Sequence, residues 1–390
     1  MSRSAGKCRK LSIYIHIPFC KSKCYYCDFI SYASKENIVE EYIKYLKVEL
    51  AEVAEGIKLD KKEVAIKTIY IGGGTPSYIN SNYIVEIIKQ IKEQYNVNED
   101  TEITLEVNPG TVDESKLQKY FNVGINRLSI GLQSTDNERL KQIGRIHTYE
   151  EFIKTYETAQ KVGFNNINID IIIGLPNQKA EEIKQSIKGI IKLEPKHISI
   201  YSLIIEEGTK IEKMLENREI ELPEESEERQ MYWEIKQALE KEGYFHYEIS
   251  NFAKKGYESK HNIDCWKQKE YIGFGASAHS YTEGVRYSNL ESIEEYIQNF
   301  KENKQEDNII IHEKQDKTAM AKEYIILALR MLEGISIDNF YEKFEYDILK
   351  GFAKEFEKLQ NQELIKIENG YIALTNKGID LANLVWEEFI

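Results

Sequence analysis

Three cysteines near the start of the chain have a spacing that suits iron–sulfur chemistry. Cys20, Cys24 and Cys27 form a Cys-x-x-x-Cys-x-x-Cys run directly after a β-branched segment. Three thiolates on one tight loop can hold three irons of a [4Fe-4S] cluster, which leaves the fourth iron open to a small molecule. Zinc is the alternative, but it usually takes a fourth Cys or His nearby, and His16 lies inside the strand-like segment. The spacing predicts a cluster with these three cysteines as its ligands.

A glycine run follows the next β-branched segment of the chain. Gly72, Gly73 and Gly74 stand there before Thr75 and Pro76. Glycine lets the backbone approach a ligand closely. A tight turn explains the run equally well when it is taken alone. Together with the cysteines one strand upstream, the run indicates a second part of the same binding site.

The first half of the chain alternates short β-branched runs with amphipathic stretches of helical period. Each run is short enough for a buried strand. The expected strands are 12–17, 67–71, 101–107, 126–130, 166–173 and 196–203, and the clearest helices are 38–54, 83–95, 149–162 and 180–192. This alternation predicts a parallel sheet with right-handed crossovers. Six units are too few for a closed eight-fold barrel, so we expect an α/β fold with an open, partial (β/α)6 barrel whose ligands sit at the carboxyl ends of the strands.

The second half of the chain has a different pattern. From Tyr244 to about Tyr287 it is rich in Gly, His, Tyr and Ser without clear periodicity, which predicts ordered loops or short strands leaning on the barrel. The end of the chain predicts a winged-helix-like α+β domain with helices at 318–332, 337–344 and 346–359, a hairpin at 364–368 and 371–374, and a closing helix from 377. The Asn-Gly pair between the two short strands is a strong hairpin signal.

Composition limits the partners that the chain can have. Its 390 residues predict one large and one smaller domain. The net charge of −13 disfavours nucleic acid, which needs a basic face, and simple electrostatic docking on anionic lipid. No long apolar run follows the N-terminus or reaches spanning length, so we expect a cytoplasmic protein with reduced thiols. Cys8 and Cys265 stand apart from the cysteine run.

The cysteine run, the aromatic Tyr26 directly before Cys27, and the glycine motif together resemble the radical S-adenosylmethionine (SAM) superfamily. The resemblance implies that the open iron of the [4Fe-4S] cluster binds SAM. It also implies that the segment with Gly73, Gly74 and Thr75 offers backbone groups to the SAM amino group. In this superfamily the reduced cluster cleaves SAM to methionine and a 5′-deoxyadenosyl radical, and the protein positions the cofactor and excludes water.

The segment Tyr14–Cys20 resembles the start of one branch of the superfamily. This branch contains the oxygen-independent coproporphyrinogen III oxidases (HemN) and the heme chaperones (HemW), and the likeness runs from about residue 12 to the C-terminus. The further SAM-site residues that it implies are Tyr14 beside the sulfonium, Glu106 at the ribose, Gln133, Arg145 near the carboxylate, and Asp170. These residue types suit their roles, because a carboxylate binds hydroxyls and an arginine binds a carboxylate.

Within this branch, three features favour the chaperones. Phe29 stands where the oxidases have a fourth cysteine, and only about ten residues precede the first expected strand. The stretch His261–Trp266 is similar to the chaperone motif His-Asn-x-x-Tyr-Trp, with Cys265 in place of the tyrosine. The resemblance therefore implies heme binding through His261, with His246 and His279 as alternative ligands. Cys265 is either a soft heme ligand or a small buried residue.

The resemblance also implies partners and a division of the chain. The expected partners are heme, acceptor hemoproteins, flavodoxin or ferredoxin as electron donor, and membranes transiently through the acceptors. The expected parts are a radical SAM core at 11–245, a loop-rich extension at 246–315 and a HemN-like C-terminal domain at 316–390. The alternative function is that of the oxidase, which converts two porphyrinogen propionates to vinyl groups, so enzymatic activity stays open.

Overall fold

The computed structural model describes residues 9–56 and 64–390, and its main body is a curved sheet that does not close. The strand order is β14-β13-β12-β11-β1-β4-β5-β6-β7-β8-β10-β9. The six central strands run parallel to one another. They are β1 (Arg9–Ile17), β4 (Val64–Gly73), β5 (Val97–Val107), β6 (Arg127–Gln133), β7 (Asn166–Ile173) and β8 (His197–Ser202). The predicted partial barrel is confirmed.

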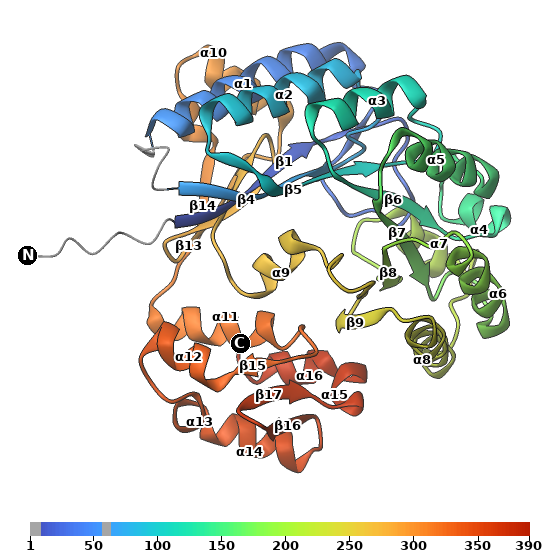
Figure 1. Ribbon diagram of the computed structural model, residues 1–390, viewed down its shortest axis with the longest axis vertical. Helices are drawn as coiled ribbons and strands as arrows, with labels where there is room; N and C mark the ends of the chain where they lie inside the picture. Colours follow the sequence, from blue (N-terminus) through green and yellow to red (C-terminus); the bar gives the residue numbers. More distant parts are fainter. Residues whose placement is uncertain (1–8, 57–63) are drawn as a thin grey trace, which may run out of the picture.

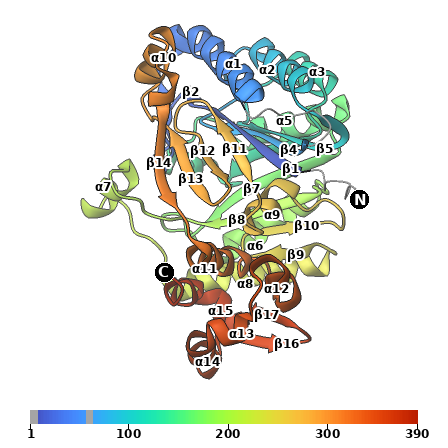
Figure 2. The same cartoon turned by 90° about the vertical axis from the view of Figure 1, so that its left-hand side faces the viewer.

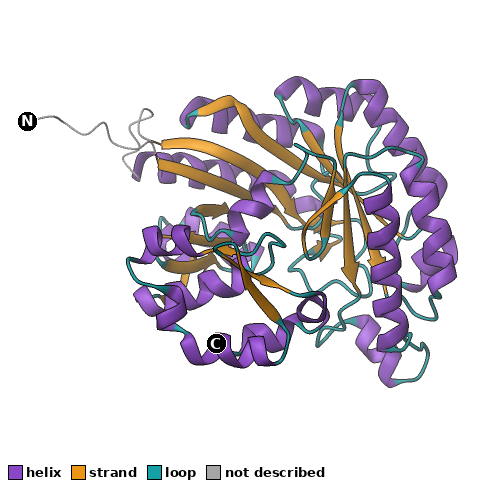
Figure 3. Ribbon diagram, turned by 60° about the horizontal axis from the view of Figure 1, so that its bottom comes forward, coloured by secondary structure: helices purple, strands orange, loops and turns teal. Residues whose placement is uncertain are grey.

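Helices cover the outer face of this sheet (Figures 1 and 3). They are α1 (Val39–Gly56), α2 (Ser81–Gln94), α3 (Glu114–Val123), α4 (Asn137–Gln142), α5 (Tyr149–Val162), α6 (Ala180–Ile191) and α8 (Glu225–Lys241). The short helix α7 (Lys210–Glu216) stands apart from this layer (Figure 2), and its Ile211 amide donates to the Tyr25 carbonyl of the cysteine loop. Sequence periodicity missed α3, which buries only Leu117, Tyr120 and Val123. Its ends are nevertheless marked, since the Asp113 side chain accepts from the Lys116 amide and Gly124 closes the helix in a left-handed conformation.

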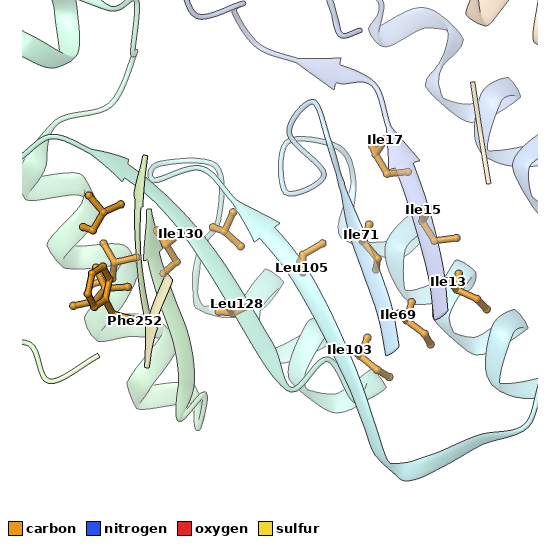
Figure 4. Close-up of a cluster of buried hydrophobic side chains, with 14 of the residues drawn as sticks. Ile13, Ile15, Ile17, Ile69, Ile71, Ile103, Leu105, Leu128, Ile130 and Phe252 are labelled. Carbon is orange, nitrogen blue, oxygen red and sulfur yellow. The ribbon is translucent and has the colours of Figure 1, made fainter. Parts of the chain in front are cut away.

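The alternation of residues along the strands separates an apolar layer from a polar one. Side chains on one face point toward the helices and form the core, among them Ile13, Ile15, Ile17, Ile69, Ile71, Ile103, Leu105, Leu128 and Ile130 (Figure 4). Their neighbours in sequence point to the opposite face, because successive strand residues alternate. Polar side chains, such as Thr68, Arg127 and Asp170, therefore fill the inside of the half-barrel.

The region after α8 widens the sheet at both edges. The short strands β9 (Phe245–Glu248) and β10 (Asn251–Ala253) add next to β8, and β11 (Tyr271–Phe274), β12 (His279–Thr282), β13 (Val285–Asn289) and β14 (Ile309–Lys314) add next to β1. Between them, α9 (Lys260–Trp266) contacts β4. Further elements are α10 (Ile293–Lys301), the 3-10 turns η1 (Glu36–Ile38) and η2 (Gln305–Asn308), and a parallel pair of β2 (Phe19–Cys20) and β3 (Tyr32–Ala33).

The C-terminal part is a small α+β unit below the sheet (Figure 2). It contains α11 (Lys317–Ala328), β15 (Ile335–Ser336), α12 (Ile337–Phe344), α13 (Ile348–Gly351), α14 (Ala353–Asn361), β16 (Ile365–Glu368), β17 (Tyr371–Leu374), α15 (Asn376–Asp380) and α16 (Ala382–Glu387). The expected third helix is two helices, because the backbone leaves the helical region at Phe352. The expected closing helix breaks in the same way at Leu381. No helix in the described part of the chain could cross a membrane.

Candidate cofactor site

A cavity of about 480 Å³ lies at the carboxyl ends of the central strands. All of the site residues predicted from the sequence line it, except Tyr14 and His261. The lining residues among them are Cys20, Cys24, Tyr26, Cys27, Gly73, Gly74, Thr75, Glu106, Gln133, Arg145 and Asp170. They come from five strands and their following loops, and the parallel sheet brings them to one edge, where ligands bind in folds of this class.

The three thiols lie together on the β2 strand and the loop after it. The Cys20 Sγ is 3.4 Å from the Thr75 hydroxyl, and the Arg145 Nη1 donates to the Cys24 Sγ at 3.5 Å. Burial raises the pKa of Cys20, and it raises the pKa of Cys27 to about 11. The metal-free Cys20 and Cys27 thiols therefore keep their protons at neutral pH, and a bound metal must displace them.

The donor set fits an iron–sulfur cluster better than a single zinc ion. A zinc ion draws its ligands around one centre, whereas a cluster binds each thiolate through a different iron. His16 is not a fourth ligand here, because its ring nitrogens contact the Tyr14 hydroxyl and the Ile30 carbonyl.

The glycine turn after β4 is fixed by close packing on β1. Gly73 has a φ of 108°, and a Cβ there would lie 2.6 Å from the His16 ring. A Cβ on Gly74 would lie 2.9 Å from the Phe19 backbone. The Gly74 and Thr75 amides also donate to carbonyls of the first strand and its extension. A tight turn and a ligand-binding role therefore both explain the glycine run. The packing on β1 requires glycine at these positions, and the turn that they form lines the cavity.

Arg145 joins the cysteine loop to the strand ends. Its Nη2 donates to the Asn108 Oδ1 at 2.7 Å and to the Gly131 carbonyl at 2.8 Å. Its Nε is buried and has no hydrogen-bond partner within the described residues. Asn108 in turn donates to Thr75 at 2.9 Å. A held guanidinium with an unused donor suits the carboxylate of a ligand such as SAM.

Two carboxylates face the cavity from neighbouring parts of the sheet. Glu106 accepts from the Tyr70 hydroxyl at 2.8 Å, and burial, together with the charge of Asp170, raises the pKa of Glu106 to about 7. Asp170 accepts from Ser129 and Asn168, and burial also raises the pKa of Asp170. Both groups offer acceptor oxygens to hydroxyls, as a ribose requires.

Tyr14 and His261 lie outside the cavity lining. The Tyr14 hydroxyl is 2.9 Å from the His16 Nδ1, and its ring stacks on Tyr70. The His261 Nδ1 is 2.7 Å from the Thr68 Oγ1, its ring centroid is 5.0 Å from that of Tyr70, and burial lowers the pKa of His261 to about 3. Tyr70 lines the cavity and contacts both residues. Their ligand roles stay predictions.

Sequence reasoning missed several residues that line the cavity, namely Tyr70, Asn108, Ser129 and Tyr201. A signal for them exists in the strand period. Tyr70 and Ser129 alternate with the core residues of their strands, so they share the inner face with the predicted residues. Asn108 follows Glu106 by two residues at a strand end.

Comparison with known proteins identifies the family. Residues 14–190 match the radical SAM superfamily, and residues 315–381 match the HemN C-terminal domain. A protein of Lactococcus lactis named heme chaperone HemW is 36% identical over 97% of both chains. A Bacillus subtilis protein of the same name is 34% identical over 97% of this chain and 99% of its own. The chain belongs to the HemW family of radical SAM proteins.

Membership in the HemW family agrees with the site. A [4Fe-4S] cluster and SAM are the cofactors of the radical SAM superfamily, and the residues of the cavity fit both. When bound, they supply one-electron chemistry at the SAM sulfonium. Escherichia coli HemN has a similar fold, with a TM-score of 0.84 over 98% of this chain and 90% of its own. Its sequence is 23% identical, so this likeness concerns the fold alone.

Proposed function

We propose that this protein is a heme chaperone, which binds heme and delivers it to hemoproteins. The support is the similarity to proteins named heme chaperone HemW along 97% of the chain. The observation that carries the choice against the oxidase is Phe29. It lies at the cavity with 63% of its surface exposed, at the place where oxidases of this branch have a fourth cysteine. A phenyl ring cannot replace a thiol in chemistry, but it offers apolar surface.

The remaining partners follow from this function. We propose acceptor hemoproteins as clients, a flavodoxin or ferredoxin as the electron donor to the cluster, and membrane contact only through membrane-bound acceptors. Cytoplasmic location suits a chain whose cluster needs reduced thiols. We also propose to treat 11–245, 246–315 and 316–390 as three functional parts: the cofactor core, the heme-handling extension and a partner-binding or packing domain.

The role proposed for His261 requires a conformational change. Its helix α9 is held by Glu102, which accepts hydrogen bonds from the backbone amides of Lys260 and His261 at 3.1 Å each. The Asp264 side chain pairs with Lys67 at 2.5 Å. Heme could reach the His261 ring only if these contacts opened.

The decisive experiment compares heme binding with porphyrinogen turnover. Anaerobically reconstituted protein is titrated with heme and, in parallel, incubated with coproporphyrinogen III, SAM and a reductant. We expect heme binding with one-to-one stoichiometry and an unchanged coproporphyrinogen. Phe29→Cys, which restores the oxidase residue, should not create turnover by itself. Formation of harderoporphyrinogen or protoporphyrinogen by the wild type would instead assign the oxidase function.

A further inference from the structure

The seven histidines of the chain differ sharply in their access to a ligand. His16 and His197 are buried with both ring nitrogens in hydrogen-bonding contacts. His147 and His261 are buried with one such contact each. His246 is half-buried, and its Nε2 contacts the Tyr232 hydroxyl and the Ile249 carbonyl. A heme iron needs an imidazole nitrogen that a flat macrocycle can reach, and none of these five offers one in this conformation.

The other two histidines, His279 and His312, are exposed and lie side by side. Their rings are nearly parallel, with centroids 5.4 Å apart and an interplanar angle of 16°. They belong to β12 and β14, which are separated by β13. Ser288 of β13 pairs in register with His279, and its hydroxyl is 2.8 Å from the His312 Nε2. Both imidazole rings therefore lie next to Ser288, on the same face of the sheet extension.

The surroundings of His279 favour the neutral imidazole, the form that binds a metal. Partial burial lowers the pKa of His279, and the neighbouring His312 and Arg286 lower it further, against an opposing effect of Glu291. The imidazole is then neutral at physiological pH and its nitrogen lone pair is available. Stacking on His312 covers a face of the ring, and within residues 9–56 and 64–390 its nitrogens have no hydrogen-bond partner.

Apolar surface adjoins this pair. Ile309, Ile310 and Ile311 of β14 are 50%, 38% and 54% exposed, directly before His312 in the strand. Ile310 pairs in register with Ser288, so it lies beside the two rings. Ile309 and Ile311 point to the opposite face of β14, because successive strand residues alternate. An exposed isoleucine next to accessible imidazoles is an unusual combination on a surface that is otherwise strongly charged.

We propose that the heme iron binds the imidazole of His279, with the stacked His312 positioning that ring and Ile310 of β14 contacting the macrocycle. The proposal rests on the heme-binding function proposed above and names its site. Heme combines an iron that accepts imidazole with a flat apolar ring. The extension at β12–β14 offers an imidazole ligand and an apolar side chain at its surface. Heme can bind there without the movement of α9 that binding to His261 would require.

The test uses the full chain with its cluster and follows heme by difference spectra against heme-free protein, because the cluster also absorbs visible light. His279→Phe keeps an aromatic ring but removes the ligand, and it should weaken heme binding at least about tenfold and abolish the low-spin heme signal. His312→Phe keeps the stack and should retain that signal. Added imidazole should restore the low-spin signal in His279→Gly.

Two controls separate the possible failures. Metal-free protoporphyrin IX should bind wild type and His279→Phe equally, since it needs only the apolar surface. Unchanged heme affinity in His279→Phe, or its loss only in His261→Ala or His312→Phe, would overturn this assignment and leave the chaperone function standing. A wild type that binds no heme at all would overturn the proposed function itself.

Discussion

The two ends of the half-barrel use the same inner face of the sheet in opposite ways. At the carboxyl ends of the strands, Glu106, Arg145 and the thiols surround a cavity. Toward the amino ends of the strands, α9 occupies the interior, and the side chains of Glu102 and Thr68 form hydrogen bonds with it. Both ends of the inner face are polar because polar side chains alternate with core residues along each strand. At the amino end, the hydrogen-bond partners of Glu102 and Thr68 come from α9 of the same chain.

This difference shows what a polar barrel interior requires. Buried polar groups need hydrogen-bond partners wherever they lie. At the amino end, residues of the extension supply partners to Glu102 and Thr68, while the Arg127 Nε and the Trp266 Nε1 are buried without a hydrogen-bond partner within the described residues. At the carboxyl end, the Arg145 Nε is left without one within the described residues. A ligand has room at the carboxyl end, where an unused donor faces the cavity, and the following predictions test this division.

The largest effect is expected at the cysteines. Replacing Cys20, Cys24 and Cys27 together with Ala should abolish the cluster, which we expect to contain about four irons per reconstituted chain. Cys265→Ala, on α9 at the other end of the barrel, should keep the iron. Iron analysis and EPR of the reduced protein measure both. Retention of iron in the triple variant would place the cluster elsewhere.

The second prediction concerns the anchor of α9. Glu102→Ala removes an acceptor that binds two backbone amides, and each hydrogen bond to a charged group contributes about 1.5–3 kcal/mol. We expect the free energy of unfolding to fall by roughly 3 kcal/mol, measured by urea denaturation. Glu99→Ala, at an exposed position of the same strand, is the matched control. Equal stability of the two variants would contradict the anchoring role of Glu102.

The third prediction concerns the free donor in the cavity. Arg145→Gln should weaken SAM binding about ten- to a hundredfold, because a charge-assisted hydrogen bond is lost. The cluster should remain, since the guanidinium only donates to one of its sulfurs. SAM-induced changes in the EPR spectrum report the affinity. Arg139→Gln, which loses a pair with Glu182 outside the cavity, is the control; a similar loss there would remove Arg145 from the site.

The smallest effect is a pH dependence. Glu106 has a pKa of about 7 in the folded protein, above its ordinary value near 4.5, so the folded state holds its proton more tightly than the unfolded chain. Its contribution to stability therefore falls as pH rises from about 4.5 to 7. SAM affinity should rise, by less than about tenfold between pH 6 and 8, as the carboxylate that accepts from hydroxyls forms. Glu106→Gln should flatten this profile, and an equally steep profile would assign the titration to another group.

Elements with a strong hydrophobic period could be predicted almost to the residue. The bounds of β7 and α5 agree with those expected from the sequence. The helix α3 was missed because it buries few side chains, and the breaks at Phe352 and Leu381 leave no mark in the apolar pattern. The sheet extension was hardest to foresee, since its strands are short and pair with distant parts of the chain.

For the site, motif spacing predicted which residues gather at the strand ends, because parallel strands bring their ends together. It could not show depth along the inner face. His261 and Tyr14 lie on the same inner face of the sheet as the cavity residues, but they do not line the cavity. Tyr70 lies between them and the cavity, since it lines the cavity and contacts both side chains. Nor could it reveal that His279 and His312 stack, since 32 residues and a strand separate them.

The edge strand β14 has a consequence for the behaviour of the protein in solution. All six of its residues are exposed, and on its outer side no strand within the described residues pairs with it. An apolar strand edge of this kind is a template for strand addition by another molecule, which leads to aggregation. The irregular pairing at Arg286 and Tyr287 and the charges of Glu313 and Lys314 oppose such growth. We therefore expect the heme-free protein to aggregate more readily than the heme-bound protein, because a macrocycle bound beside Ile310 would cover part of that edge.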